Sequence, residues 1–143
     1  MQKIFFHSAD KPASRLLHKT KLKQRIEQLF KKEQVKLDSL NYVFCSDEYL
    51  LQINREFLKH DFYTDIITFD LSEKTGAVIG EVYISLDRVK ENAAALGTIF
   101  NEELLRVVFH GALHLCGYRD KKKADIEEMR KKEEQYLRLY NKQ

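Results

Sequence analysis

The run LLRVVFHGALHLC, residues 104–116, restricts the fold of this chain more than any other segment. Asn101, Glu102 and Glu103 precede it and are typical of a helix N-terminus, where a polar residue caps free N–H groups and acidic side chains favour the helix dipole. A helix that is apolar on nearly every side has to be buried on nearly every side. The sequence therefore predicts a central helix that the rest of the fold surrounds.

The segments around this helix alternate between strand and helix patterns. Alternating, β-branched and aromatic segments predict strands, whereas apolar residues three and four apart predict helices. The short turn SEKTG predicts a hairpin, and Gly97 predicts a helix end. We expect strands at about 4–6, 40–45, 64–71 and 77–85, and further helices at about 14–33, 46–58, 86–96 and 124–140.

Together these elements fit one domain. With 143 residues and 43% hydrophobic composition, the chain can bury one core, and it has one proline, five glycines and no linker-like or repeated segment. We therefore expect a single domain over residues 1–143 of the α+β class, with three layers and a small mixed β-sheet flanked by helices.

The sequence also predicts a cytoplasmic protein that does not act on membranes. No apolar run approaches the roughly 18 residues of a membrane span, and the N-terminal MQKIFFHSADKP lacks the small-residue cleavage site of a signal peptide. Cys45 and Cys116 are not in a CxxC spacing. We expect them to be reduced thiols, with Cys116 a small buried apolar residue.

The charge of the chain is mildly basic, at a formal +3 and a sequence pI near 8.8. This permits a polyanionic partner without demonstrating one. Solvated helix faces explain the basic clusters more simply than a binding surface does. Those clusters are Lys31–Lys32, Lys121–Lys123 and Lys131–Lys132, and Lys21, Arg25 and Lys32 also align on one face of their helix.

His110 and His114 are four residues apart on the predicted central helix, so their side chains lie one above the other and can hold one cation. Gly117 can then turn the chain back and bring Asp120 to the same place. Two unrelated core histidines are the alternative, but unpaired imidazoles in a buried helix are costly. Three protein ligands leave a fourth position open, which is typical of a catalytic site.

Zinc is the ion that a helical histidine pair favours, and the anionic Asp120 also makes Mn²⁺ or Fe²⁺ acceptable. The zinc proteases with an HExxH motif carry a glutamate after the first histidine, and Gly111 stands in that position here. The general base of those enzymes is therefore missing.

Three stretches resemble the YbeY family of bacterial endoribonucleases. HGALHLCGYRD (residues 110–120) is similar to the family's HGxLHLxGYDH signature, INREFLKHDFYTDIITF (53–69) to LNxxYRxxDxPTDVLSF, and GEVYIS (80–85) to GDIxIS. The resemblance runs from Ile53 to the end of the chain. It departs from the pattern at Asp120, where the family has a third histidine, and at Leu58, where it has an arginine.

The resemblance implies a zincin-like metal-binding helix and a zinc-dependent hydrolase that cuts single-stranded RNA. Such an enzyme would mature the 3′ end of small-subunit (16S) ribosomal RNA and act in ribosome quality control, with ribosomal RNA and the ribosome as partners and no DNA. His110, His114 and Asp120 would hold the metal, and the two histidines would act through its water. Candidate auxiliary residues are Lys59 and His60 for the missing arginine, and Asp65 and Glu81 as a second base.

Three other functions fit parts of the pattern. A metallopeptidase-like hydrolase shares the metal geometry but needs the absent glutamate. A ribosome-assembly factor could bind RNA or protein and use the metal structurally, and the absence of the family's arginine favours it. A non-haem iron oxygenase uses two histidines and a carboxylate, but its ligands usually stand on strands.

Overall fold

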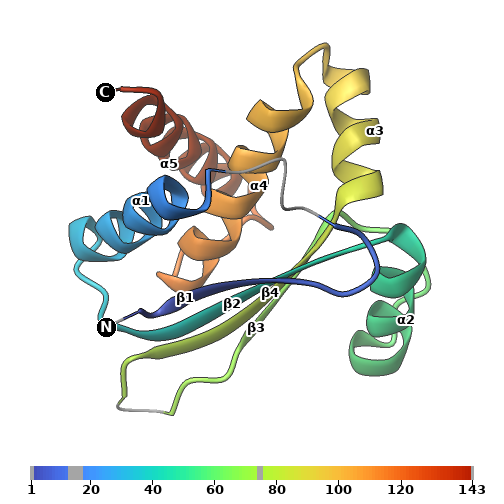
Figure 1. Ribbon diagram of the computed structural model, residues 1–143, viewed down its shortest axis with the longest axis horizontal. Helices are drawn as coiled ribbons and strands as arrows, with labels where there is room; N and C mark the ends of the chain where they lie inside the picture. Colours follow the sequence, from blue (N-terminus) through green and yellow to red (C-terminus); the bar gives the residue numbers. More distant parts are fainter. Residues whose placement is uncertain (1, 13–17, 74–75, 143) are drawn as a thin grey trace.

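The computed structural model describes residues 2–12, 18–73 and 76–142, and it confirms the expected order of strands and helices (Figure 1). The elements are β1 (Ile4–Ser8), α1 (Lys19–Lys32), β2 (Leu37–Cys45), α2 (Asp47–Leu58), β3 (Ile66–Asp70), β4 (Val78–Ser85), α3 (Leu86–Leu96), α4 (Phe100–Leu115) and α5 (Lys123–Asn141). Residues 14–17, where we expected the first helix to begin, lie outside the described residues.

Two of the expected helix ends hold and one differs. The Ser46 hydroxyl caps α2 by accepting a hydrogen bond from the backbone N–H of Tyr49 at 3.1 Å. Gly97 ends α3 in the left-handed conformation, with φ at 69°. The central helix α4 begins at Phe100, one residue earlier than predicted, and its cap residue Ile99 offers no side-chain acceptor.

The four strands form one mixed sheet in the order β1-β2-β4-β3. β1, β2 and β4 run parallel to one another, while β3 pairs antiparallel with β4 as the predicted hairpin. β1 and β3 are therefore the edges of the sheet, and β3 is the edge strand whose residues line the site described below.

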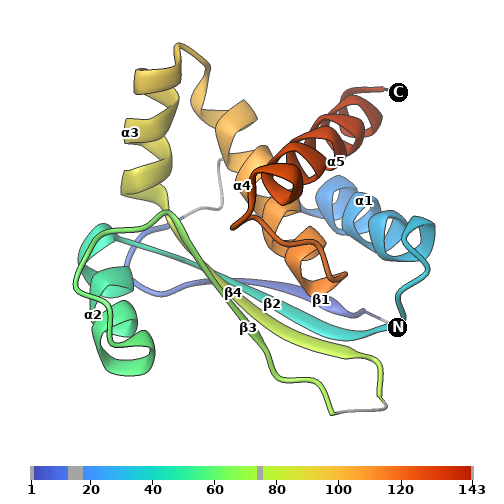
Figure 2. The same cartoon turned by 180° about the vertical axis from the view of Figure 1, so that it is seen from behind.

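Helices cover both faces of this sheet, which gives the three layers that we expected. α1, α3, α4 and α5 lie over one face, and α2 lies on the other side at one end of the strands (Figures 1 and 2). Alternation along β4 directs Val82 and Ile84 into the main core. On the opposite face, Leu50 of α2 packs with Cys45 and Ile67 in a second, smaller cluster.

The central position of α4 is confirmed by its burial, since ten of its residues are buried. Glycine lets it approach the sheet closely: a Cβ added to Gly111 would lie 2.9 Å from Cγ1 of Val82. The Tyr42 hydroxyl of β2 also donates a hydrogen bond to the Val108 carbonyl at 2.8 Å. Among the helices in the described ranges, none is both long and apolar enough to cross a membrane.

Candidate metal centre

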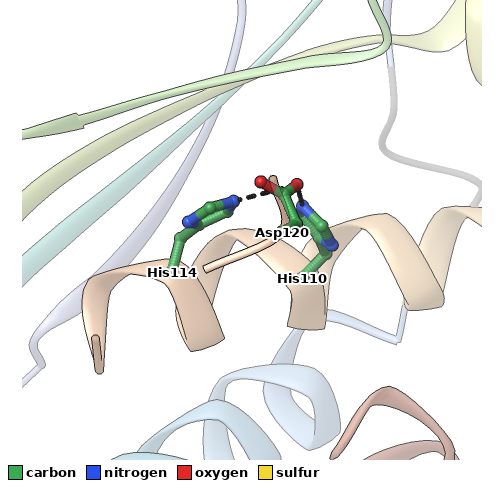
Figure 3. A group of neighbouring side chains, drawn as sticks. All are labelled: His110, His114 and Asp120. Atoms are coloured by element: carbon green, nitrogen blue, oxygen red, sulfur yellow. Dashed lines mark ion pairs between the residues drawn. The ribbon is translucent and has the colours of Figure 1, made fainter. Parts of the chain in front are cut away.

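His110 and His114 occupy the exposed side of α4, where the helix meets a cleft. Their Nε2 atoms both lie 3.2 Å from Oδ2 of Asp120. Figure 3 shows the two rings turned toward the aspartate, which comes from the loop after the helix. One ligand atom from each of the three residues falls within 4.8 Å of the others. The helix spacing and the loop thus bring together the three residues that the sequence singled out.

The loop that carries Asp120 turns back at Gly117, whose φ of 104° is a conformation that side chains with a Cβ rarely adopt. The Gly117 N–H donates to the His114 carbonyl at 3.0 Å, and the Tyr118 N–H donates to the Leu113 carbonyl at 3.1 Å. The Tyr118 hydroxyl then donates to Oε1 of Glu33 at 2.6 Å, which ties the loop to α1. These bonds hold Asp120 above the histidine pair.

The distances from Asp120 to the two histidines fit a tetrahedral ion. Zinc–nitrogen and zinc–oxygen distances of about 2.0–2.2 Å place neighbouring ligand atoms of a tetrahedron roughly 3.3 Å apart. The two nitrogen–oxygen separations of 3.2 Å match that value. Two imidazoles and one carboxylate are also a donor set that first-row divalent metals accept. The residues therefore fit a metal ion.

Glu133 of α5 fixes the orientation of His110. Its Oε2 lies 2.6 Å from Nδ1 of His110, and its other carboxylate oxygen accepts from Nη1 of Arg106 at 3.3 Å. A carboxylate on one ring nitrogen keeps the proton there and leaves the lone pair of the other nitrogen for a metal. Glu133 is only 5% exposed, so this contact belongs to the packed interior and not to the solvent-exposed surface.

Glu133 was not among the residues predicted for the site, although the sequence contains a signal for it. On the last helix the apolar positions Met129, Tyr136 and Tyr140 recur at helical spacing, and residue 133 falls on the same face. A carboxylate at such a position needs a partner inside the fold. Only the packing of α5 on α4 shows that the partner is His110, one of the candidate ligands.

Among the groups that line the cleft, His110 and Asp65 have shifted pKa values that bear on the candidate metal site. Burial by itself lowers the pKa of His110, but the hydrogen bond that the ring donates to Glu133 and the charges of Glu133, Asp120 and Asp65 outweigh it and raise the pKa. Burial raises the pKa of the Asp65 carboxyl above its usual range, and the neighbouring His110 partly offsets the rise. A carboxylate with a raised pKa beside a metal site is suited to accept a proton.

The cleft has a volume of about 900 Å³ and is lined by His60 and Asp65 together with the three ligands. Leu58 lines it as well. Lys59, the left-handed C-cap residue of α2 with φ at 59°, is not among the lining residues. Of the four candidate auxiliary residues, His60 and Asp65 therefore reach the cleft.

Glu81, the remaining candidate, lies on the other face of the sheet. Its neighbours Gly80 and Val82 are buried beneath the helices, so alternation along β4 directs residue 81 away from them. There it accepts a hydrogen bond from the Tyr83 hydroxyl at 3.2 Å and lines a separate hollow beside α2. Its position corrects the expectation that it could act as a base at the metal.

Three further basic residues line the cleft: Arg106, Lys121 and Arg130. Arg106 is engaged by carboxylates, with Nη2 at 2.6 Å from Glu134 and Nη1 at 3.3 Å from Glu133. Within the described parts of the chain, Lys121 and Arg130 form no ion pair with a carboxylate. They are the cations in this cleft that are available to a phosphate.

Gly111 has no room for the glutamate of the zinc proteases. Besides the 2.9 Å approach to Val82, an added Cβ would lie 3.1 Å from Cδ1 of Ile66. A longer side chain would therefore have to separate α4 from the sheet that supports it. The packing of the helix thus argues against a peptidase mechanism independently of the motif.

Cys45 and Cys116 are both free thiols, as expected. Burial raises the pKa of each thiol to about 12. Cys116 is half-buried rather than buried, and it does not belong to the group of potential metal ligands.

Known proteins match this chain along almost its whole length. The sequence profile of the family described as Endoribonuclease YbeY matches residues 6–141. Endoribonuclease YbeY from Cytophaga hutchinsonii is 48% identical over 136 residues, which cover 95% of this chain and 94% of that protein. Endoribonuclease YbeY from Christiangramia forsetii is 46% identical over 116 residues, covering 81% and 80% of the two chains.

A solved structure has the same fold. The solution structure of TM1509 from Thermotoga maritima superposes with a TM-score of 0.68 at 32% sequence identity, covering 95% of this chain and 88% of that one.

Proposed function

The chain belongs to the endoribonuclease YbeY family, as its motifs predicted, and from that premise we propose that it is a single-strand-specific metallo-endoribonuclease that matures the 3′ end of small-subunit ribosomal RNA. Family membership supports a nuclease of ribosomal RNA processing. The observation that carries the metal-dependent mechanism is the His110–His114–Asp120 triangle, which opens into a cleft large enough for a nucleotide.

Zinc is the ion that we propose for this centre, because two imidazole nitrogens form most of the donor set. The single carboxylate leaves Mn²⁺ and Fe²⁺ as alternatives. When bound, such an ion supplies Lewis acidity toward a phosphoryl oxygen and lowers the pKa of a coordinated water.

Residues of the chain would bind the ion, orient its ligands and accept the proton. Nε2 of His110 and of His114 and a carboxylate oxygen of Asp120 would hold the ion, and Glu133 would keep the His110 ring in place. Asp65 would accept the proton of the attacking water, since its raised pKa makes it a stronger base than an ordinary carboxylate. The proposed reaction thus needs no glutamate at position 111.

The phosphate of the substrate would be held by His60, Lys121 and Arg130, the cationic or ionisable residues that line the cleft without a carboxylate partner among the described residues. None of them takes the place of the family's arginine, because Leu58 occupies that position. We propose that the protein acts in the cytoplasm, on ribosomal RNA and on ribosomes under quality control. We expect no activity on DNA.

A ribosome-assembly factor with a structural metal remains the second candidate. The observation that favours it is Leu58, an apolar side chain in the cleft where the family's motif carries a cation. Structural zinc sites are closed by four protein ligands, however, and the three ligands here face an open cleft.

Metal content and RNA cleavage measured on one sample test the proposal. We expect the purified chain to hold one zinc ion and to cut single-stranded RNA, and His114→Ala to lose both because a three-ligand site becomes a two-ligand one. His7→Ala is the matched control, since His7 is exposed and bonded to Asn41 at 2.7 Å on the other side of the sheet from the metal site. A His114→Ala variant that retains stoichiometric metal and activity would refute the assignment.

A further inference from the structure

A second concave surface lies outside the metal cleft, along α1 and α5, which lie side by side (Figure 2). It consists of two adjoining hollows of about 680 and 400 Å³. We call it the basic groove, after the seven basic residues that line it: Arg25, Lys31, Lys32, Arg130, Lys131, Arg138 and Lys142.

The net charge of the molecule is concentrated in this groove. It contains seven of the 25 basic residues and one of the 22 acidic ones, Glu134, which gives it a formal charge of +6. With +3 for the whole chain, everything outside the groove sums to −3. A surface of one sign on an otherwise acidic molecule attracts polyanions.

The positive charges of the groove are also unpaired. Across the described residues, none of the seven cations forms an ion pair with a carboxylate, and Glu134 is taken up by Arg106 from α4. Some cations outside the groove, such as Arg55, Arg88 and Lys132, have a carboxylate partner, and others, such as Lys36 and Lys90, are single cations without an ion pair among the described residues. The groove therefore presents charge that the fold itself does not neutralise.

The groove adjoins the metal cleft. Arg130 lines both the cleft and the larger hollow, and Lys32 lines both hollows of the groove. Lys131 and Lys142 are eleven residues apart along α5, which is about 16 Å at 1.5 Å per residue. That distance is longer than a single phosphate group and is long enough for the backbone of several nucleotides.

We propose that the basic groove binds the phosphate backbone of the RNA that flanks the nucleotide in the metal cleft. This inference rests on the proposed nuclease function and extends it from a cleavage centre to a substrate track. The occupant is RNA rather than a membrane or a protein, because the apolar residues that line the groove, Phe109, Tyr136 and Leu139, are buried or half-buried. None of the large hydrophobic side chains that the described residues expose lies in it. Membrane and protein surfaces need such anchors, whereas a nucleic-acid backbone needs charge.

Binding of two RNA lengths to a groove variant tests this. The groove variant is Lys32→Gln, Lys131→Gln and Arg138→Gln together, none of which lines the metal cleft. The control variant is Lys19→Gln, Lys36→Gln and Lys90→Gln, which removes the same charge from exposed sites outside the groove. Fluorescence anisotropy follows single strands of about 4 and about 16 nucleotides over a salt series, with zinc and again with a chelator.

We expect the groove variant to bind the longer RNA at least about tenfold more weakly than the unaltered chain. The slope of log affinity against log salt concentration should become smaller by about 2, because each of the three lost phosphate contacts contributes about 0.7. Its affinity for the shorter RNA and its cleavage of that RNA should equal those of the unaltered chain, as should every property of the control variant. If no variant cleaves RNA but the length-dependent difference persists, the nuclease function fails and the groove stands. The proposal would be overturned if the groove variant bound the longer RNA with the affinity and salt slope of the unaltered chain, or if the control variant lost as much affinity. The first result would overturn it even if the groove variant had lost binding to an acidic protein partner.

Discussion

Glu133 contacts the candidate metal ligand His110 without being a candidate ligand itself. Its substitution therefore tests whether orienting His110 matters for metal binding. Glu133→Gln keeps the size of the side chain but replaces the anionic acceptor at 2.6 Å from Nδ1 with a neutral amide. We expect zinc affinity to fall about 10- to 100-fold, the usual effect of losing such a partner. Competition with a chromophoric chelator measures it, and circular dichroism confirms that the fold is kept.

Glu134→Gln is the matched control for that substitution. Glu134 carries the same charge and binds Arg106 at 2.6 Å, but it has no contact with His110. Equal losses of zinc affinity in the two variants would mean that the charge near Arg106, and not the orientation of His110, sets the affinity.

Leu58 is the residue at which this chain differs most from its family in chemistry. It lines the cleft and is 39% exposed, so an arginine there would have room to reach a phosphate. Leu58→Arg would add a charge-assisted contact worth about 1.5–3 kcal/mol, or roughly a ten- to hundredfold increase in kcat/KM for single-stranded RNA. Leu71→Arg adds the same charge on the other face of the sheet and should change nothing.

His60 and Lys59 are the two neighbours that could compensate for Leu58, and the structure separates them. His60 lines the cleft and stacks on Phe62 with ring centroids 5.0 Å apart, whereas Lys59 does not line it. We expect His60→Ala to lower kcat/KM about tenfold, the value of one modest contact, and Lys59→Ala to leave it unchanged. Unaltered cleavage of RNA by both variants would show that no basic residue is needed at this edge of the cleft.

At the scale of elements, one carboxylate joins α1, α5 and the loop that carries Asp120. Glu33, the C-cap residue of α1, accepts hydrogen bonds from Tyr118 at 2.6 Å, from Lys132 at 3.2 Å and from Tyr136. Burial alone would raise the pKa of Glu33, but these hydrogen bonds and the charge of Lys132 lower it below its ordinary value of 4.5. The bonds are therefore strongest with Glu33 ionised.

The sign of this shift predicts how stability depends on pH. A carboxyl group with a lowered pKa in the folded state stabilises the fold above its ordinary pKa, and the contribution is lost as the pH falls through the lowered value. We expect Glu33→Gln to be less stable than the unaltered chain at pH 7, with the difference shrinking once the pH falls below 4.5. Urea denaturation midpoints over that range measure it.

Glu27→Gln on the same helix is the control, because Glu27 forms none of these three hydrogen bonds. The assigned role of ionised Glu33 would be contradicted if the stability difference between the Glu33→Gln variant and the unaltered chain stayed constant from pH 7 to well below 4.5.

At the scale of the whole molecule, α5 connects the two surfaces of the proposed enzyme. Glu133 on one face of the helix contacts the candidate metal ligand His110, and Lys131 and Arg138 on another face line the basic groove. Arg130 stands between them and lines both. The mild net charge of +3 conceals this arrangement, because an average over the chain does not record that the positive charge gathers along two helices.

The sequence by itself determined the elements and the three candidate metal ligands. Helix and strand patterns are local, since each repeats within a few residues, and His110, His114 and Asp120 lie within eleven consecutive positions that one helix and one glycine turn bring together. The resemblance to a known family rests on the same short stretches.

Only the tertiary structure decided which faces of these elements meet. Periodicity shows that residue 133 is on an apolar face but not that this face packs on His110, 23 positions away along the chain. The direction of Glu81 away from the cleft follows from which face of β4 the helices cover, and the basic groove arises because α1 and α5, at opposite ends of the chain, pack side by side. Long-range pairings of this kind are selected by the packing of the whole core, which no local segment of the sequence specifies.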